Sequence, residues 1–242
     1  MAQFRIDKYL ADAGIGTRSQ IKKYIKTGLV RINDTCVTRP ETKIDTSVDI
    51  IYFNNRPVQI EELEYYILNK PAGYVSATKD NIFPTVMELI SSNRKDLSPV
   101  GRLDKDTEGL LLITNDGALS HRLLSPKHHV DKIYYAKVAG IMTKEDVIAF
   151  EKGLEIGDED LQTTLPADLK IDSIDESSNL SYVYITLREG KYHQVKRMVH
   201  AVGKEVLYLK RISFGGLELP KDLEPGQSRA LTKPELEILL SN

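Results

Sequence analysis

Apolar residues recur with helical spacing near the start of the chain. Ile6, Tyr9 and Leu10 fall on one face of a helix that Gly14 ends. The segment Thr17–Gln20 fits a capping box, so a second helix is expected to run from there to about residue 27. Strand-like segments follow at 29–33 and 36–39, separated by a turn. The pattern therefore predicts a small unit of two helices followed by a hairpin-rich sheet.

The rest of the chain alternates between strand-like and helix-like segments. Strands are predicted at 65–69, 110–113, 134–139, 181–187 and 206–212, and helices at 84–90, 118–124, 143–153 and 195–202. Asp116 and Thr143 are the expected N-caps of two of these helices. Strands outnumber helices and many connections are short, so this part should be an α+β domain around a mixed, mostly antiparallel sheet.

A link between the two parts is expected near residues 55–63, N-R-P-V-Q-I-E-E-L. Pro57 restricts the backbone there, and the two glutamates mark a change in charge. The predicted domains are residues 1–60 and 61–242.

Composition narrows the class of protein. The chain has 242 residues, 41% hydrophobic and 28% charged, which is enough apolar material for folded cores. It has no long apolar run and no signal-peptide pattern at its start, so a cytoplasmic protein without a membrane span is expected. The single cysteine, Cys36, excludes an internal disulfide and a site built from several cysteines. It is read as a small core or edge residue.

Charge is distributed unevenly. The net charge is −2, but residues 1–60 carry ten basic and six acidic side chains and so have a charge of +4, which leaves −6 for the remainder. Arg18, Lys22 and Lys26 are spaced four apart and form a basic stripe on the second helix. Such a stripe is either a solvated face or a contact with RNA phosphates. Arg31 lies on the following strand, and the resemblance described below for the start of the chain favours RNA contact for these four residues.

The segment most indicative of chemistry is Gly101–Gly117, G-R-L-D-K-D-T-E-G-L-L-L-I-T-N-D-G. A polar loop carrying Asp104 runs directly into an apolar segment long enough for a buried strand. A carboxylate on a loop braced in this way is placed as catalytic groups usually are. Asp106 and Asp116, by contrast, are interpreted as turn and cap residues.

That segment closely resembles the G-R-L-D-x-D-T-x-G-L-L-L-L-T-N-D-G signature of RsuA-type RNA pseudouridine synthases. Further matches to this family are Leu68–Ala77, His129–Tyr134, Glu189–Met198 and Val206–Arg211. The resemblance implies that Asp104 is the catalytic carboxylate, Tyr134 the active-site tyrosine and Lys196 the basic partner of the aspartate. It also implies that Leu209 lines the base pocket, and Leu103 and Arg102 are expected beside it. Lys196 replaces the commoner arginine, which keeps the charge but loses bidentate geometry.

The reaction implied by the resemblance needs no cofactor, because uridine is isomerised without oxidation or group supply. No metal is expected either. His193 and His200 lie seven apart, as metal ligands can, but they have no cysteine or carboxylate at suitable spacing.

The opening F-R-I-D-K-Y-L-A-D-A-G-I-G-T-R-S resembles the alpha-L RNA-binding module of ribosomal small-subunit protein four. The expected partner is ribosomal RNA or a partly assembled small subunit, bound by a monomer. Within the family, the modest length, the absence of a basic C-terminal tail and the segment Ser125–Val130 resemble members that modify 16S ribosomal RNA at uridine 516. A sister enzyme for 23S ribosomal RNA and a non-catalytic assembly factor are the alternatives.

Overall fold

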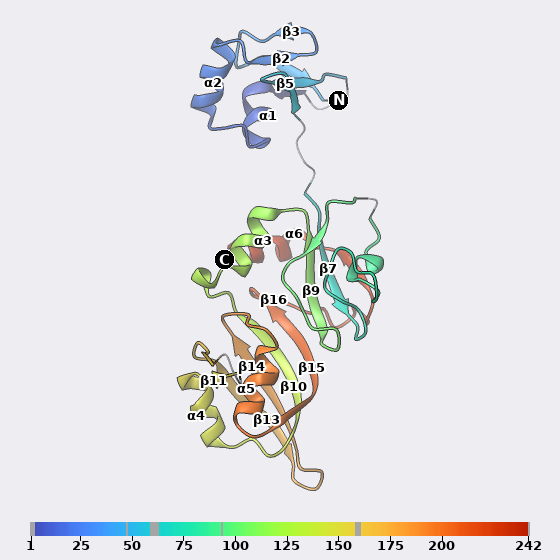
Figure 1. The fold of residues 1–242 in the computed structure, drawn as a ribbon. Coiled ribbons are helices and arrows are strands. Elements are labelled where there is room, and N and C mark those ends of the chain that lie inside the picture. The colour runs from blue at the N-terminus through green and yellow to red at the C-terminus, as the bar shows by residue number, and fades with distance from the viewer. Residues whose placement is uncertain (1–2, 47, 59–62, 93, 158–160, 242) are drawn as a thin grey trace. The chain divides into compact units, whose positions relative to one another are not determined.

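The computed structural model describes residues 3–46, 48–58, 63–92, 94–157 and 161–241. The chain divides into two compact units, residues 1–62 and 63–242 (Figure 1). No helix in the described ranges is long and apolar enough to cross a membrane.

The first unit has its own apolar core. Its helices are α1 (Ile6–Asp12) and α2 (Arg18–Lys26), and its strands are β1 (Gln3–Arg5), β2 (Val30–Ile32), β3 (Thr35–Cys36), β4 (Lys43–Asp45), β5 (Ile51–Phe53) and β6 (Arg56–Val58). The predicted capping box is confirmed, because the Thr17 hydroxyl accepts from the Gln20 backbone and the Gln20 side chain accepts from the Thr17 N–H. Cys36 is exposed on the edge strand β3, which fits the edge role expected of it.

The expected link is shorter than the sequence indicated. Residues 56–58 belong to β6, which pairs with β5 at the edge of the four-stranded sheet in the order β3-β2-β5-β6. Pro57 fits there because an edge strand has one side free of ladder hydrogen bonds. Residues 59–62 of the predicted link lie outside the described residues.

A nine-stranded mixed sheet organises the second unit. The order β13-β14-β10-β15-β9-β7-β17 is antiparallel throughout except where β15 and β9 run parallel, and β16 and β8 join β15 and β9. The strands are β7 (Tyr65–Lys70), β8 (Ser98–Pro99), β9 (Glu108–Thr114), β10 (Lys132–Ala139), β13 (Asp168–Asp175), β14 (Leu180–Leu187), β15 (Glu205–Phe214), β16 (Leu217–Glu218) and β17 (Ser228–Ala230); β11 (Glu155–Ile156) and β12 (Gln162–Thr163) form a separate hairpin. The predicted α+β architecture is confirmed.

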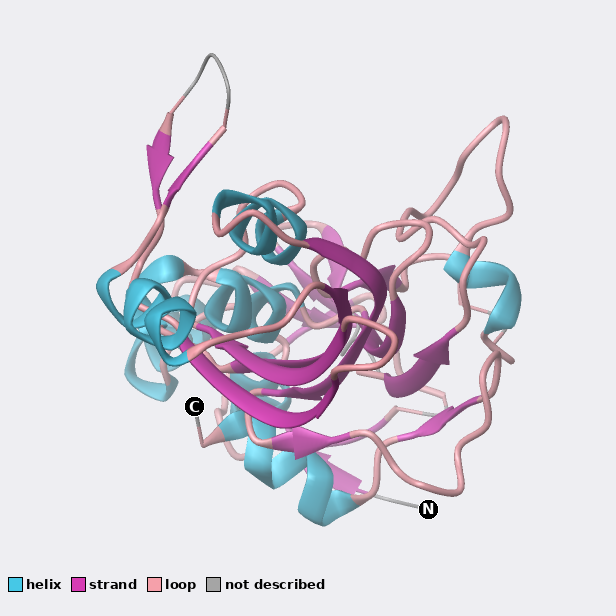
Figure 2. Ribbon diagram, turned by 90° about the horizontal axis from the view of Figure 1, so that it is seen from below, coloured by secondary structure: helices cyan, strands magenta, loops and turns pink. Residues whose placement is uncertain are grey.

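Helices cover both faces of this sheet (Figure 2). They are α3 (Gly117–Leu124), α4 (Lys144–Lys152), α5 (Gln194–Ala201) and α6 (Lys233–Leu240), with 3-10 turns η1 (Val86–Leu89) and η2 (Pro126–His128). Asp116 and Thr143 cap α3 and α4 as predicted. The segment expected to form a helix at 84–90 is a 3-10 turn, capped by Thr85.

Strand β9 is continuously apolar because both of its faces are buried. Leu110 and Leu112 pack with α3 and α6 in one core, whereas Leu111 and Ile113 pack in the other core with α4 and α5. The strand therefore fixes the end of the loop that precedes it, which carries Asp104.

Candidate active site

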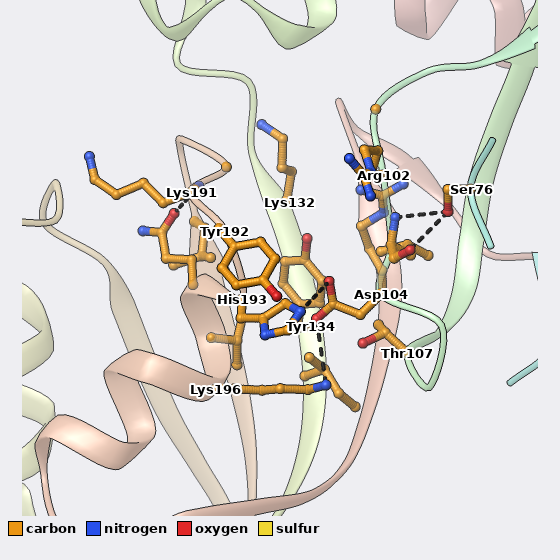
Figure 3. A pocket seen from close by; sticks show the side chains of 18 of the residues that line it. Ser76, Arg102, Asp104, Thr107, Lys132, Tyr134, Lys191, Tyr192, His193 and Lys196 are labelled. Carbon is orange, nitrogen blue, oxygen red and sulfur yellow. Dashed lines mark hydrogen bonds and ion pairs between the residues drawn. The ribbon is translucent and has the colours of Figure 1, made fainter. Parts of the chain in front are cut away.

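A cavity of about 660 Å³ opens in the second unit, and Asp104 lies on its wall (Figure 3). One side is the loop between β8 and β9, and the other is the turn that leads into α5. Its floor is formed by side chains of β10 and β15.

The Asp104 loop is held in place by two side chains from the preceding segment. Lys70, at the end of β7, is fully buried, and its Nζ donates to the carbonyl oxygens of Pro71, Asp104, Lys105 and Thr107 at 2.7–3.2 Å. The Ser76 hydroxyl both accepts from the Leu103 N–H and donates to the Leu103 carbonyl. The backbone on both sides of Asp104 is thus tied down, which pre-organises its carboxylate.

Lys70 was not identified from the sequence as a site residue. Its burial lowers the pKa of its ammonium group from 10.5 to about 8, despite the opposing pull of nearby carboxylates. A lysine just before a Pro-Gly turn resembles an ordinary strand end, and only the tertiary fold brings four carbonyls around it.

Two basic side chains from α5 face the Asp104 carboxylate. Lys196 Nζ is 3.5 Å from one carboxylate oxygen, and His193 Nε2 is 3.5 Å from the other. The Asp104 and Lys196 side chains are each 28% exposed, so the pair is partly screened from water. The structure therefore places Lys196 beside Asp104, as expected. It also places His193 there, a residue to which the sequence interpretation gave no role.

Lys196 also contacts a second carboxylate, and more closely. Its Nζ lies 2.7 and 2.8 Å from the two oxygens of Asp106. Burial alone would raise the pKa of Asp106, but the hydrogen bond and charge of Lys196 outweigh it and hold the pKa below its usual value. The turn role expected for Asp106 is incomplete, because its side chain also positions Lys196 between two carboxylates.

The turn before α5 has an unusual but well-braced backbone. His193 adopts a left-handed conformation, with φ 48° and ψ 34°, at the position that caps the helix. Gln194 secures the turn, since its side chain accepts from the Lys191 N–H and donates to Glu189, each at 2.8 Å. Tyr192 stacks on His193 with 3.8 Å between ring centroids. This geometry aims the imidazole at Asp104 (Figure 3).

Apolar walls adjoin the carboxylate. Tyr134 on β10 and Leu209 on β15 are 9% and 5% exposed and line the cavity. Tyr135 points to the opposite face of the sheet, where it contacts other tyrosines. Leu103 and Arg102 line the cavity from the Asp104 loop, with Leu103 buried and Arg102 exposed. All six residues expected at the site thus border one cavity.

The expected RNA contacts of the first unit lie apart from this cavity in the chain. Arg18, Lys22 and Lys26 are exposed on α2. Arg31 on β2 is half-buried, with its guanidinium 4.9 Å from the centre of the Tyr52 ring. Of these four expected contacts, the three on α2 are therefore the freely accessible ones.

Within the described residues, no three His, Cys, Asp or Glu side chains gather in a way that could hold a metal ion. At its centre the Asp104 carboxylate faces Lys196 and His193, and apolar side chains lie beside it. This arrangement can hold an ionised carboxylate against an electron-poor carbon while an apolar pocket keeps water away.

Comparison with known proteins gives matches along nearly the whole chain. Residues 64–201 match the RNA pseudouridylate synthase family, and residues 4–50 match the S4 domain. An uncharacterised RNA pseudouridine synthase of Bacillus subtilis is 43% identical over 237 residues, covering 97% of this chain and 98% of that protein.

Two relatives are named for opposite ribosomal subunits. Ribosomal small subunit pseudouridine synthase A of Vibrio vulnificus is 38% identical over 234 residues, covering 96% of this chain and 98% of its own. Ribosomal large subunit pseudouridine synthase B of Bacillus subtilis is 38% identical over 236 residues, covering 97% and 95%. Among solved structures, a crystal structure of pseudouridylate synthase matches with a TM-score of 0.67 and 37% identity, covering 98% of this chain and 99% of that one.

Proposed function

Since the chain belongs to the RNA pseudouridylate synthase family, we propose that it is a ribosomal RNA pseudouridine synthase acting on uridine 516 of 16S ribosomal RNA. Asp104 is the proposed catalytic carboxylate. The observation that carries this proposal is the juxtaposition of Asp104 with Lys196 and His193 beside the walls formed by Tyr134 and Leu209.

The chemistry needs these groups. The N1–C1′ bond of uridine breaks, the uracil turns, and a C5–C1′ bond forms; C5 loses a proton and N1 gains one. Asp104 can stabilise the electron-poor sugar, bond to it covalently or remove a 2′ proton, and each route requires an ionised carboxylate near C1′. Lys196 and His193 each lie 3.5 Å from that carboxylate and are placed to orient it.

The walls retain the detached base. Tyr134 is placed to stack on the uracil and to assist removal of the C5 proton, and Leu209, on the neighbouring strand, excludes water from the cavity. A uridine in a stacked helix cannot reach this cavity, so it must be flipped out at a cost of roughly a few kcal/mol. Arg102, exposed at the cavity edge, is available to fill the vacated space or to bind phosphate.

Replacing Asp104 by asparagine tests the catalytic assignment. The Asp104→Asn variant removes the negative charge while keeping the side-chain shape, so we expect no pseudouridine and nearly unchanged RNA affinity. Asp172→Asn, at an exposed position of β13, is the matched control and should keep full activity. Pseudouridine formed by Asp104→Asn at the wild-type rate would contradict the proposed role of Asp104, whereas absence of product from the wild-type protein would favour the non-catalytic alternative.

Mapping of pseudouridines tests the substrate. Ribosomal RNA from cells with and without the protein should differ at uridine 516 of 16S ribosomal RNA. The relative named for the large subunit favours 23S ribosomal RNA as the second candidate, and a difference confined to 23S ribosomal RNA would select it. The proposed partner is a partly assembled small subunit in the cytoplasm, and in-vitro conversion of separated 16S and 23S transcripts and of such particles checks it.

A further inference from the structure

Two buried cations line the same cavity next to the apolar walls. Lys132 on β10 and Arg211 on β15 are 7% and 2% exposed, and both border the cavity. Figure 3 shows Lys132 on the side of Tyr134 away from Lys196. Buried positive charges are costly unless a negative partner compensates them.

Neither cation has a carboxylate partner in the part of the chain that the structure describes. Lys132 Nζ donates to the Val130 carbonyl at 2.8 Å, and Arg211 Nε donates to the Leu110 carbonyl at 2.8 Å. Arg211 Nη2 is buried and has no hydrogen-bond partner. A buried guanidinium donor without a partner is rare in folded proteins, and Arg211 is one of the residues that line the cavity.

The nearest carboxylates are already occupied. Asp131 pairs with Arg188 at 3.1 Å, and Glu189 pairs with Lys191 at 2.9 Å. Burial and the charge of Arg211 together lower the pKa of Lys132 to about 8. This end of the cavity is therefore short of negative charge, and an anion bound there would stabilise both cations.

The spacing of the strands suggests which anion fits. Lys132 is two residues from Tyr134 on β10, and Arg211 is two residues from Leu209 on β15, so each cation shares a sheet face with one apolar wall. Two residues of strand span roughly 7 Å. A uracil against Tyr134 and Leu209 would leave the cations within reach of the same nucleotide, where its backbone phosphate can approach them.

We propose that Lys132 and Arg211 form an anion subsite that binds a backbone phosphate next to the flipped uridine. The subsite rests on the proposed function, because it takes Tyr134 and Leu209 as the walls around the base. Arg211 offers a planar set of donors for the phosphate oxygens, and Lys132 adds a point charge.

A double-mutant cycle between protein and RNA tests the subsite. The protein variant is Lys132→Met, with Lys137→Met as a matched control on the opposite face of β10. The RNA is a 16S fragment containing uridine 516, with a neutral methylphosphonate placed at the phosphate on either side of the target uridine or at a remote phosphate. Binding is measured by anisotropy of the labelled fragment at several salt concentrations.

We expect Lys132→Met to weaken binding of the normal fragment about tenfold or more, as for loss of a charged hydrogen bond. The salt slope should fall by about one, as for loss of one phosphate contact. One of the two adjacent methylphosphonates should remove the effect of the substitution, whereas the remote one should not. Lys137→Met should leave binding unchanged.

Equal binding of all fragments by wild type and Lys132→Met would overturn the subsite. So would a variant that binds normally and only converts more slowly, because that result assigns Lys132 to the uracil instead. Conversion of the unmodified fragment by wild type is measured separately. Absence of product overturns the uridine 516 assignment alone, and the binding cycle on a ribosomal RNA fragment that wild type does convert then decides the subsite.

Thermal stability gives an independent readout. Lys132 has one hydrogen bond and lies 5.4 Å from the centre of the Phe214 ring but has no ion-pair partner among the described residues, so removal of its buried charge should raise the Tm of Lys132→Met even as RNA binding weakens. A fall in Tm would count against an uncompensated site. Lys132→Gln, which retains a donor for the Val130 carbonyl, is the second variant should the methionine protein fail to fold.

Discussion

At the scale of single residues, Lys70 holds in place the loop that carries Asp104. Its ammonium group satisfies four carbonyl oxygens, three of them in the loop from Asp104 to Thr107. In Lys70→Met these carbonyls lose their donor, so we expect a loss of roughly 2 kcal/mol in the free energy of unfolding. Activity should fall further than stability predicts, because the loop that is released carries Asp104, the proposed catalytic residue. Chemical denaturation and single-turnover assays measure the two effects, and full activity in this variant would contradict the positioning role.

The lowered pKa of Lys70 predicts a pH dependence of stability. Below about pH 8 the ammonium group is protonated in both the folded and the unfolded protein. Between about pH 8 and 10.5 the unfolded chain still binds a proton that the folded protein has lost. The contribution of Lys70 to the free energy of unfolding therefore rises with pH across this window. The difference in unfolding free energy between wild type and Lys70→Met, measured from pH 7 to 10, should show that rise; a flat difference would contradict it.

Sequence motifs indicated which residues meet at the site but not how they meet. Asp104, Tyr134 and Lys196 are recognisable because each belongs to a matching segment. The contact of Lys196 with Asp106 and the left-handed turn at His193 depend on how α5 packs against the Asp104 loop. No local pattern encodes such long-range geometry, which is why these features emerge only from the structure.

At the scale of elements, the parallel pairing of β9 with β15 is short. It is recorded at two register pairs, Lys210 with Glu108 and Arg211 with Gly109. Gly109 has a φ of +101°, and a Cβ there would collide with the Arg211 backbone. The pairing of β9 with β15 therefore depends on glycine at this position, which lies just after the loop that carries Asp104.

Gly109→Ala should therefore be strongly destabilising, by more than about 2 kcal/mol, because both backbone strain and a steric clash oppose it. Gly117→Ala is the matched control, since a Cβ at the start of α3 meets nothing within 4 Å. That control should be neutral or slightly stabilising, as alanine favours the helix. Urea denaturation compares the two variants. Equal unfolding midpoints would contradict the dependence of the β9–β15 pairing on Gly109.

Elements with a local signal were predicted best. Capping residues Thr17, Asp116 and Thr143 mark helix starts by chemistry contained within a few residues. Segment 84–90 has a capping signal too, but the tertiary fold allows only a 3-10 turn there. Strand β6 was missed because Pro57 argues against a strand unless the strand is known to lie at an edge.

At the scale of the whole molecule, the two units have separate cores and separate charge. The first unit carries the exposed basic stripe of α2, and the second carries the cavity. Deletion of residues 1–62 should therefore leave a folded second unit that binds RNA more weakly, with a smaller dependence of affinity on salt. Titrations from low to high salt measure the slope. An unchanged slope would show that the stripe does not contact phosphates.

Because Lys70 is buried, the rate at which its amine is chemically modified reports how often the surrounding loop opens. Acylating reagents modify surface lysines rapidly, but they reach the sealed Lys70 amine only while the surrounding loop is open. Because Lys70 donates to the backbone of Asp104 itself, its labelling reports when the proposed catalytic carboxylate is released from its position in the folded loop. Mass spectrometry of the peptide that contains Lys70 measures the rate of this labelling. RNA bound in the cavity should lower that rate.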